Sequence, residues 1–404
     1  MQEMNECIHF AWYVDCLSLW CQQLTKNRLN FKDEILLYIT LELLIIFTFS
    51  LSLLYALRSL AKRIQLVDVP NARKNHSGAI PLVGGIAISI TFLLYILVNP
   101  SSFTYPYHLC SAMVILLVVG VLDDKYDVDF KIRFAVQGGL ALAMMIFADV
   151  KLHSLGDILG VGDIHLDWFG YIVTVFAVIG LINAFNMVDG IDGLLGGLSI
   201  VTFGAMGLLL AVEGHLNDAY ICLVLIIIML PYVLFNLGLL GRQRKIFMGD
   251  AGSMMIGFIV VWSLMCMSQI EGRVSIRPVT ALWFVAIPLM DMAAIMIRRI
   301  RRGDSPFKPD REHLHHICQR LGLTSRQTLL AICFFASLCA GFGLYGEAQH
   351  ISESIMFFSF LALFIIYALL LSYIWRVTAM LRSWFNLETN HIEVKTTSLN
   401  KSGQ

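Results

Sequence analysis

Long apolar segments recur along most of the chain, and they limit its fold more than any other feature. Most of them reach or approach the roughly 18–20 residues that a helix needs to cross a hydrocarbon core about 30 Å thick. They are continuous rather than alternating, which excludes a transmembrane β-barrel. The sequence predicts an all-α polytopic membrane protein with about eleven transmembrane helices, at 35–57, 80–98, 108–122, 134–149, 168–184, 194–213, 219–236, 251–270, 279–297, 327–346 and 353–375.

Composition agrees with this class. Hydrophobic residues make up 58% of the 404 residues and charged residues only 14%. A soluble domain needs far more charge on its surface. Residues 1–34 lack the basic start and the small-residue cleavage site of a signal peptide. The nine cysteines form no CxxC pair and mostly lie in apolar runs, so we interpret them as small buried hydrophobic residues rather than a disulfide framework.

Basic residues are distributed unevenly between the two alternating sets of linkers. One set carries 23 Lys and Arg and the opposite set carries 6. By the positive-inside rule the first set is cytoplasmic, which predicts an N-terminus outside and a C-terminus in the cytoplasm. The cytoplasmic set is 58–79, 123–133, 185–193, 237–250, 298–326 and the tail from 376.

Three parts of the chain follow from these spans. Residues 1–34 form an N-terminal extension with an interfacial character, residues 35–376 form the transmembrane domain, and residues 377–404 form a cytoplasmic tail. Segment 151–167 is polar and contains glycines, and it predicts a small hairpin or a re-entrant flap outside the membrane.

Polar motifs gather on the predicted cytoplasmic side, where several abut membrane spans. Carboxylates at a membrane boundary are costly unless they are paired or bound to a cation. Clustered carboxylates with lysines and arginines nearby indicate a hard divalent cation and a phosphorylated ligand. The motifs are NARKNHSGAIPLVGG (71–85), VLDDKYDVDFKIR (121–133), NAFNMVDGIDG (183–193), GRQRKIFMGDAGS (241–253) and RRIRRGDSPFKPDREHLHH (298–316).

Spacing suggests how the carboxylates of the second motif are presented. If the third span continues as a helix, Asp123, Asp124 and Asp127 share one face of it. Acidic loops flanked by basic residues are commonly solvated faces with weak ion pairs, and we interpret Asp129 in this way.

The next two motifs carry the remaining clustered carboxylates. Asn186, Asp189 and Asp192 recur at three-residue spacing, as one helical stripe would place them. Asp250 lies at the entry to a span, where a carboxylate meets the positive end of a helix. A structural alternative is helix capping, either by Asp250 together with Ser253 or by the two aspartates of the stripe.

VLDDKYD, NAFNMVDGIDG, FMGDAGS and SPFKPDREHLHH together resemble the signature motifs of the polyprenyl-phosphate N-acetylhexosamine-1-phosphate transferase superfamily (MraY/WecA). The resemblance runs from about residue 36 to about residue 380 and is closest to the members that use UDP-GlcNAc and undecaprenyl phosphate. It implies that the phosphate of undecaprenyl phosphate attacks the β-phosphorus of UDP-GlcNAc at the inner leaflet. Undecaprenyl-diphosphate-GlcNAc forms and UMP leaves.

The resemblance also implies a setting for this reaction. The site would face the cytoplasm from a bacterial inner membrane, and the product would start a cell-surface polysaccharide of the O-antigen or enterobacterial common antigen type. Mg²⁺ is the expected cofactor, with Mn²⁺ as an alternative. No nucleic-acid partner is expected, and the oligomeric state is left open, with a homodimer among the options.

Residue roles carry over from the family by position. Asp250 and Asn186 correspond to ligands of the Mg²⁺ ion. Asp123 and Asp124 lie where the family places its acceptor-side carboxylates, with Asp123 often cast as a general base. Because a phosphomonoester has a second pKa near ~6 and is already mostly ionised at neutral pH, orientation of the acceptor fits Asp123 equally well.

Donor contacts are implied in the same way. Asp189 and Asp192 resemble the catalytic residues near the nucleotide, and Phe247 resembles an aromatic residue that stacks on uracil, with an interfacial anchor as its alternative. The resemblance places His313 first among the histidines that contact the diphosphate and sugar. The remaining substrate-binding candidates are Asp127, Lys131, Arg133, Asn183, His315 and His316.

Several alternatives remain at this point. The HxHH run with Cys318 could hold zinc, but it lacks the HExxH order and a second ligand cluster. As imidazoles, the histidines would titrate near physiological pH. We interpret Asp291 as the partner of Arg298 in an intramembrane pair. The rival functions are a phospho-MurNAc-pentapeptide transferase and a transporter, for which polar residues at the midplane and inverted repeats would be expected.

Overall fold

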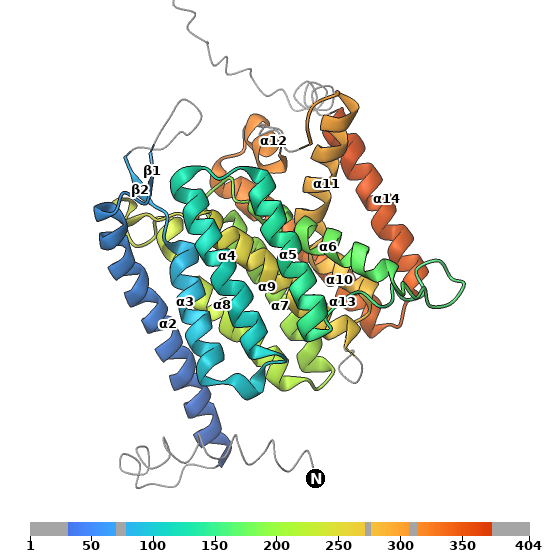
Figure 1. Ribbon diagram of the computed structural model, residues 1–404, viewed down its shortest axis with the longest axis horizontal. Coiled ribbons are helices and arrows are strands. Elements are labelled where there is room, and N and C mark those ends of the chain that lie inside the picture. Colours follow the sequence, from blue (N-terminus) through green and yellow to red (C-terminus); the bar gives the residue numbers. More distant parts are fainter. Residues whose placement is uncertain (1–30, 70–77, 271–275, 307–312, 374–404) are drawn as a thin grey trace, which may run out of the picture. The chain divides into compact units, whose positions relative to one another are not determined.

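The computed structural model describes residues 31–69, 78–270, 276–306 and 313–373. It contains two compact units, Met1–Phe49 and Ser50–Gln404, and helix α2 (Phe31–Arg63) carries the boundary between them. Every helix and strand after α2 lies in the second unit. Figure 1 shows its elements, which are almost entirely helical.

Ten further helices and one two-stranded sheet build most of this unit. The all-α prediction is confirmed. The helices are α3 (Gly84–Val98), α4 (Pro106–Tyr126), α5 (Phe130–Ala148), α6 (Phe169–Met187), α7 (Leu194–Val212), α8 (Leu216–Asn236), α9 (Asp250–Gln269), α11 (Ala286–Arg301), α13 (Ser325–Ala348) and α14 (Glu353–Ser372). The strands are β1 (Val67–Asp68) and β2 (Ile80–Pro81), and short helical turns are η1 (Pro100–Ser102), η2 (Arg242–Arg244), α10 (Pro278–Phe284) and α12 (Leu314–Arg320).

The helices correspond to the predicted spans. Among the described residues, nine helices are long and apolar enough to cross a membrane. The ninth predicted span is a pair, α10 and α11, bent by 82° around Val285. The second predicted span is α3, which has only 15 helical residues. Counting these two, each predicted span has its helix, and the multi-pass membrane class follows.

Segment 151–167 forms a hairpin. Ser154 and His165 make an antiparallel bridge, and the amide of Leu166 donates to the carbonyl of His153 at 2.8 Å. The hairpin that the sequence predicts is therefore confirmed, and its place outside the membrane stays a prediction.

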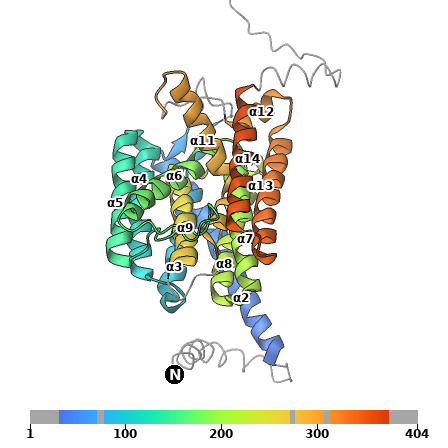
Figure 2. The same cartoon turned by 90° about the vertical axis from the view of Figure 1, so that its right-hand side faces the viewer.

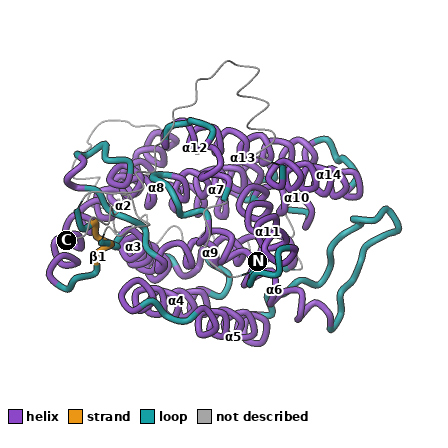
Figure 3. The backbone as a smooth tube through the Cα atoms, turned by 90° about the horizontal axis from the view of Figure 1, so that it is seen from above, coloured by secondary structure: helices purple, strands orange, loops and turns teal. Residues whose placement is uncertain are grey.

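Helix α9 is the central helix of the unit. Of the most apolar stretch of α9, 89% is buried, more than in any other candidate span of the described residues. Figure 3 shows α9 between α4 and α5 on one side and α7 and α8 on the other, and it packs directly against α3, α4 and α6. The first residue of α9 therefore lies where several helix ends meet.

Glycines allow the close contacts at the start of α9. A Cβ atom at Gly85 of α3 would overlap the backbone of Gly252, and one at Gly120 of α4 would overlap the backbone of Ala251. The first turn of α9 is therefore held between two neighbouring helices at backbone contact. Figures 1 and 2 show that α12 and the turn between α4 and α5 lie at the same end of the helices.

Candidate functional site

An extended segment leads into α9 and is pinned along its length. The amide of Phe247 donates to the carbonyl of Pro81 at 2.9 Å. The amides of Gly84 and Gly85 donate to the carbonyls of Phe247 and Met248, both at 2.9 Å. This short parallel pairing with the start of α3 fixes the residues just before Asp250.

Asp250 is the first residue of α9 and faces the end of α6. Its Oδ1 accepts a hydrogen bond from Nδ2 of Asn186 at 2.6 Å, and the same amide donates to Oγ of Ser253 at 2.8 Å. The residue preceding the helix is Gly249, with no side-chain cap. The alternative in which Asp250 and Ser253 cap the helix is therefore wrong, and the two expected metal ligands are in contact.

The adjacent aspartates of α4 face different partners. Asp123, whose side chain is 2% exposed, accepts from Arg133 at 2.5 Å and from the amide of Val128 at 2.9 Å. Asp124 accepts from the amides of Asp250 at 2.7 Å and Ala251 at 3.3 Å. Both carboxylates thus lie beside α9, and all four of their oxygens accept a hydrogen bond.

The predicted shared face with Asp127 is wrong. Helix α4 ends at Tyr126, and Asp127 follows in a left-handed conformation with φ of 54° and an exposed side chain. Arg133, in contrast, lies within the group, since its NH1 is also 4.0 Å from Oδ2 of Asp250. Lys131 is exposed, and its amide donates to Asp129, which caps α5.

The motif after α6 is a turn rather than a helical stripe. Helix α6 ends at Met187, so Asp189 and Asp192 lie in the connection to α7, and that helix begins after Gly193 without a side-chain cap. Both the predicted stripe and the capping alternative for these aspartates are wrong. Asp192 instead accepts from Nζ of Lys245 at 2.6 Å.

Asn236 joins this turn to the segment before α9. Its Oδ1 accepts from the amide of Gly193 at 2.5 Å, and its Nδ2 donates to the carbonyl of Ile246 at 2.9 Å. Asn236 is buried at the end of α8. Two motifs that lie 50 residues or so apart are therefore tied together by one buried amide.

Asp250 interacts electrostatically with the other aspartates of the site. Its charge acts on Asp123 and Asp124 of α4 and on Asp189 of the turn. Burial, together with the charges of Asp250 and Asp192, raises the pKa of Asp189 to about 7. Repulsion of this kind is relieved when a cation enters.

The geometry of Asn186 and Asp250 fits a hard divalent ion. Because Nδ2 of Asn186 is used toward Asp250 and Ser253, its carbonyl oxygen remains as an acceptor. The Asp250 side chain is 40% exposed, and its Oδ2 lies on the side of Arg133. One carboxylate and one carbonyl oxygen are the donors that Mg²⁺ takes while it keeps several waters.

Two donor-side candidates have structural partners. Nδ2 of Asn183 donates to Oε1 of the buried Gln137 at 2.8 Å, which joins α6 to α5. Phe247 is half-buried, and Nζ of Lys245 lies 5.1 Å from its ring centroid. Lys245 therefore connects the aromatic residue to Asp192.

The histidine run lies at the same end, on and before α12. Nδ1 of His313 is 2.9 Å from Oδ2 of Asp291, whose Oδ1 accepts from the amide of Leu314 at 3.0 Å and from the hydroxyl of Tyr367 at 2.7 Å. The predicted pairing of Asp291 with Arg298 is therefore wrong. The carboxylate orients a histidine instead.

His315 lies under the turn after α6. A Cβ atom at Gly190 would overlap its imidazole, and its Nε2 is buried without a hydrogen-bond partner. Burial, together with the neighbouring His316 and His313, lowers the pKa of His315 to about 3 despite the opposing charge of Asp291. The expectation that every histidine of the run titrates near physiological pH is wrong for His315. His316 is half-buried, with its ring centroid 4.2 Å from that of His315.

Parts of two motifs lie outside the described residues. These are 71–77 of the first motif, and 307–312 of the motif that contains the histidines. The extension 1–30 and the tail from 374 lie outside them as well.

Comparison with known proteins places this site in a family. The pattern described as glycosyl transferase family 4 matches residues 106–268, the stretch that carries both α4 aspartates, the turn after α6 and the start of α9. An undecaprenyl-phosphate alpha-N-acetylglucosaminyl 1-phosphate transferase from Yersinia pestis is 48% identical over 86% of this chain and 95% of that protein. The chain belongs to glycosyl transferase family 4. The resemblance to the polyprenyl-phosphate N-acetylhexosamine-1-phosphate transferases is thereby confirmed.

Other members of the family cover the chain to a similar extent. Proteins with the same name from Escherichia coli (strain K12) and Haemophilus influenzae are 46% and 45% identical over 86% and 81% of the chain, and 95% and 93% of their own lengths. As a family 4 transferase, the chain carries the transferase class predicted from its motifs.

Sequence reasoning missed three residues that build the site. Lys245, Asn236 and Gln137 each bridge two segments that are distant in sequence. A signal existed for two of them, because Gln137 and Asn236 are polar residues in otherwise apolar runs, and such residues usually have a specific partner. Lys245 lies in a basic loop, where sequence gives no means to single it out.

Proposed function

We propose that this family 4 transferase moves GlcNAc-1-phosphate from UDP-GlcNAc to undecaprenyl phosphate, giving undecaprenyl-diphosphate-GlcNAc and UMP. The observation that carries the proposal is the near full-length identity of 45–48% to relatives named for this activity. A site at the ends of membrane helices supports it, because one substrate is a lipid and the other is water-soluble.

The acceptor side is built around Asp123 and Arg133. In the reaction, an oxygen of the lipid phosphate forms a bond to the β-phosphorus of UDP-GlcNAc, and the bond from that phosphorus to the bridging oxygen of UMP breaks. Phosphoryl transfer depends mainly on positioning and on neutralisation of charge. Arg133, held by Asp123 and close to Asp250, supplies a cation between the two reacting phosphates. Asp123 positions this arginine.

The metal side is built around Asp250 and Asn186. These residues would hold Mg²⁺, or Mn²⁺ in its place, and the bound ion would neutralise charge on the donor diphosphate. Four carboxylates that act on one another give this end of the protein a strong attraction for a cation. Asn186 supports the ligand set through its bond to Asp250.

The donor side comprises the turn after α6, Lys245, Phe247 and the histidines. Phe247 offers a ring face for uracil, and Lys245 offers a cation that can turn from Asp192 to a phosphate. Asp291 fixes the proton of His313 on Nδ1, so that Nε2 is directed away from the carboxylate toward a ligand. The enzyme would act at the inner leaflet of a bacterial inner membrane and start a cell-surface polysaccharide.

A membrane assay with radiolabelled UDP-GlcNAc and undecaprenyl phosphate tests the function. The expected result is a labelled lipid product and one equivalent of UMP, both lost in the Asp250→Ala variant. UDP-MurNAc-pentapeptide serves as the competing donor in a parallel reaction. A lipid product from that donor alone would replace the proposed function with the pentapeptide transferase. Uptake of label without UMP release would indicate a transporter.

A further inference from the structure

The Asp124 carboxylate is directed toward the first turn of α9. Its neighbour Asp123 uses its carboxylate toward Arg133 and the loop after α4. The Asp124 carboxylate points instead to the first turn of α9, where Oδ1 is 2.7 Å from the amide nitrogen of Asp250 and Oδ2 is 3.3 Å from that of Ala251. The two adjacent aspartates therefore bind different parts of the chain: Asp123 binds Arg133 and the loop after α4, and Asp124 binds the start of α9.

The start of α9 needs an acceptor from elsewhere in the chain. The first amides of a helix have no partner within the helix, and a side chain just before it usually accepts from them. In α9 the preceding residue is Gly249, which has no side chain to do so. Asp124 supplies the acceptors from another helix.

Gly249 makes room for this carboxylate. Its φ of 79° is a conformation that side-chain-bearing residues rarely adopt, and a Cβ atom there would overlap Oδ2 of Asp124. The same residue thus removes the local cap and admits the distant one. The glycine of the FMGDAGS motif and the second aspartate of VLDDKYD are therefore parts of one arrangement.

The contact between Asp124 and α9 holds the backbone of Asp250, the residue that carries the metal-side carboxylate. Gly85 and Gly120 allow α9 to approach its neighbours at Gly252 and Ala251, which fixes the helix axis within its first turn. Asp250 precedes these contacts. Its backbone is held on the α4 side by the bond from its own amide to Asp124, while its side chain is held on the α6 side by Asn186.

We propose that Asp124 is a positioning residue that caps α9 and thereby fixes the Asp250 carboxylate for the cation and the donor diphosphate. It contacts neither substrate. This replaces the catalytic role that the family resemblance implies for Asp124, and it rests on the proposed function because Asp250 is taken as the metal-side ligand. Asp123 keeps its role beside Arg133.

The test compares Asp124→Ala and Asp124→Asn with Asp123→Asn as the matched control. Hydrogen–deuterium exchange of the amides at the start of α9 is measured on purified protein without substrates. Asp124→Ala should speed exchange at Asp250 and Ala251 at least about tenfold, because these amides lose their acceptors. Asp124→Asn keeps one carbonyl oxygen, so its exchange rate at these amides should lie between those of wild type and Asp124→Ala. Asp123→Asn should leave this exchange unchanged.

Metal binding and kinetics give the second measurement. Free Mn²⁺ is followed by electron paramagnetic resonance in the presence of UDP-GlcNAc. Asp124→Ala should weaken Mn²⁺ binding about tenfold and raise the metal concentration needed for half-maximal rate by a similar factor, with KM for undecaprenyl phosphate unchanged. Asp124→Asn should recover most of the rate at high metal concentration.

Contrary outcomes are distinct. Loss of activity in Asp124→Ala with unchanged amide exchange and unchanged Mn²⁺ binding would overturn the proposal and return Asp124 to direct catalysis. If the alanine variant does not fold, the asparagine variant carries the same comparison. Failure of the proposed function would show as absence of product in the wild-type protein, while the exchange measurements would still decide whether Asp124 caps α9.

Discussion

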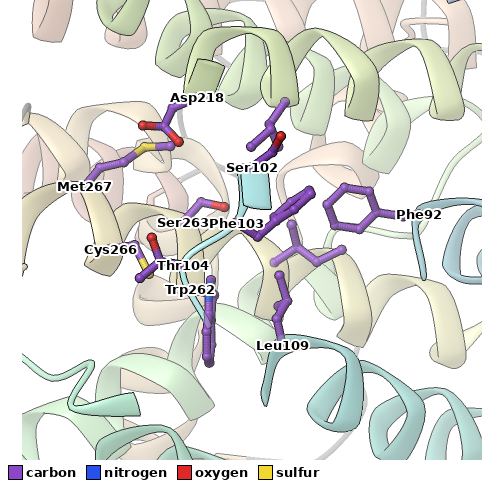
Figure 4. Close-up of a pocket in the computed structure, with 12 residues that line it drawn as sticks. Phe92, Ser102, Phe103, Thr104, Leu109, Asp218, Trp262, Ser263, Cys266 and Met267 are labelled. Atoms are coloured by element: carbon purple, nitrogen blue, oxygen red, sulfur yellow. The ribbon is translucent and has the colours of Figure 1, made fainter. Parts of the chain in front are cut away.

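The two ends of α9 differ in the side chains that surround them: carboxylates at the first turn, and mainly aromatic and apolar groups at the far end. At its first turn, carboxylates from α4 and from the turn after α6 surround Asp250, and a distant aspartate satisfies the amides. At its far end, Trp262, Ser263, Cys266 and Met267 line a small open pocket together with side chains of α3, α4, α8 and the loop at η1. Figure 4 shows its aromatic walls, formed by Phe92, Phe103 and Trp262, with Asp218 at the rim.

The contrast between the two ends distinguishes polar groups that stabilise the fold from polar groups that are available to bind a ligand. At the far end, Gln269 is buried and uses its whole amide on the hairpin, accepting from the amides of His153 at 2.8 Å and Ser154 at 3.1 Å. These polar groups therefore satisfy one another within the protein and leave no net charge to compensate. At the first turn, four carboxylates lie close together and Arg133 pairs with one of them. Their mutual repulsion opposes folding unless a ligand compensates. A cost of this kind indicates function.

The largest effect is expected when the charge of Asp250 is removed. Asp250→Asn keeps the shape of the side chain, and we expect the rate to fall on the order of 100-fold, as when one charge-stabilising group is lost from an active site. The metal concentration for half-maximal rate should rise. Asp129→Asn is the matched control and should be nearly silent, because Asp129 is exposed and serves only to cap α5. Equal losses in both variants would show that the polar end is a structural cluster.

Asp123→Asn should have the next largest effect and separates orientation from general-base catalysis. Since Asp123 is paired with Arg133, and the lipid phosphate is already ionised, we expect a loss of about tenfold that is constant over pH ~6.5–9. The measurement is the single-turnover rate against pH with saturating metal and substrates. A mutant profile that converges on wild type at high pH would restore the general base.

Asp189→Asn should change stability in a pH-dependent manner. Burial and the charges of Asp250 and Asp192 raise the pKa of Asp189 to about 7, above its value in the unfolded chain. Ionisation of Asp189 therefore costs folding free energy, and the cost grows as pH rises through ~4 to 7. In metal-free protein at pH 8, Asp189→Asn should unfold a few degrees higher than wild type, and the difference should shrink markedly toward pH ~4. A gap that is constant with pH would contradict the electrostatic explanation.

Gln269→Ala should have the smallest effect on activity and mark the contrast between the two ends. The amides of His153 and Ser154 would lose their acceptor, at about 0.5–1.5 kcal/mol for each of these part-buried hydrogen bonds. We expect a lower thermal midpoint with a transferase rate within about twofold of wild type. Gln349→Ala, at an exposed glutamine, is the control and should leave the midpoint unchanged. Loss of activity in folded Gln269→Ala would show that the far end is coupled to the site.

Much of the site was predictable because its chemistry is local in sequence. The DD, NxxD and GD motifs each indicate carboxylates near a membrane boundary, and they were predicted to lie together. In the structure, Asp123, Asp124 and Asp189 all lie close enough to Asp250 to feel its charge. What failed were the helical extrapolations. Spacing placed Asp127 and Asp192 on helices, but α4 ends at Tyr126 and α6 at Met187. In both places the chain leaves the helix, so that Asp127 lies exposed outside the group, while Asp192 reaches Lys245 from a turn.

The sequence by itself determined the membrane class, the positions of the long apolar helices and the family. Apolar length must match the bilayer, and the catalytic motifs are contiguous, so both can be read along one dimension. Only the tertiary structure decided the partners: Asp291 with His313, Lys245 with Asp192, and Asp124 with the amides of α9. Each contact joins segments 22 to 126 residues apart, and which of many equally polar candidates meet depends on how glycines let the helices approach. Sequence spacing along a single helix contains no information about that approach.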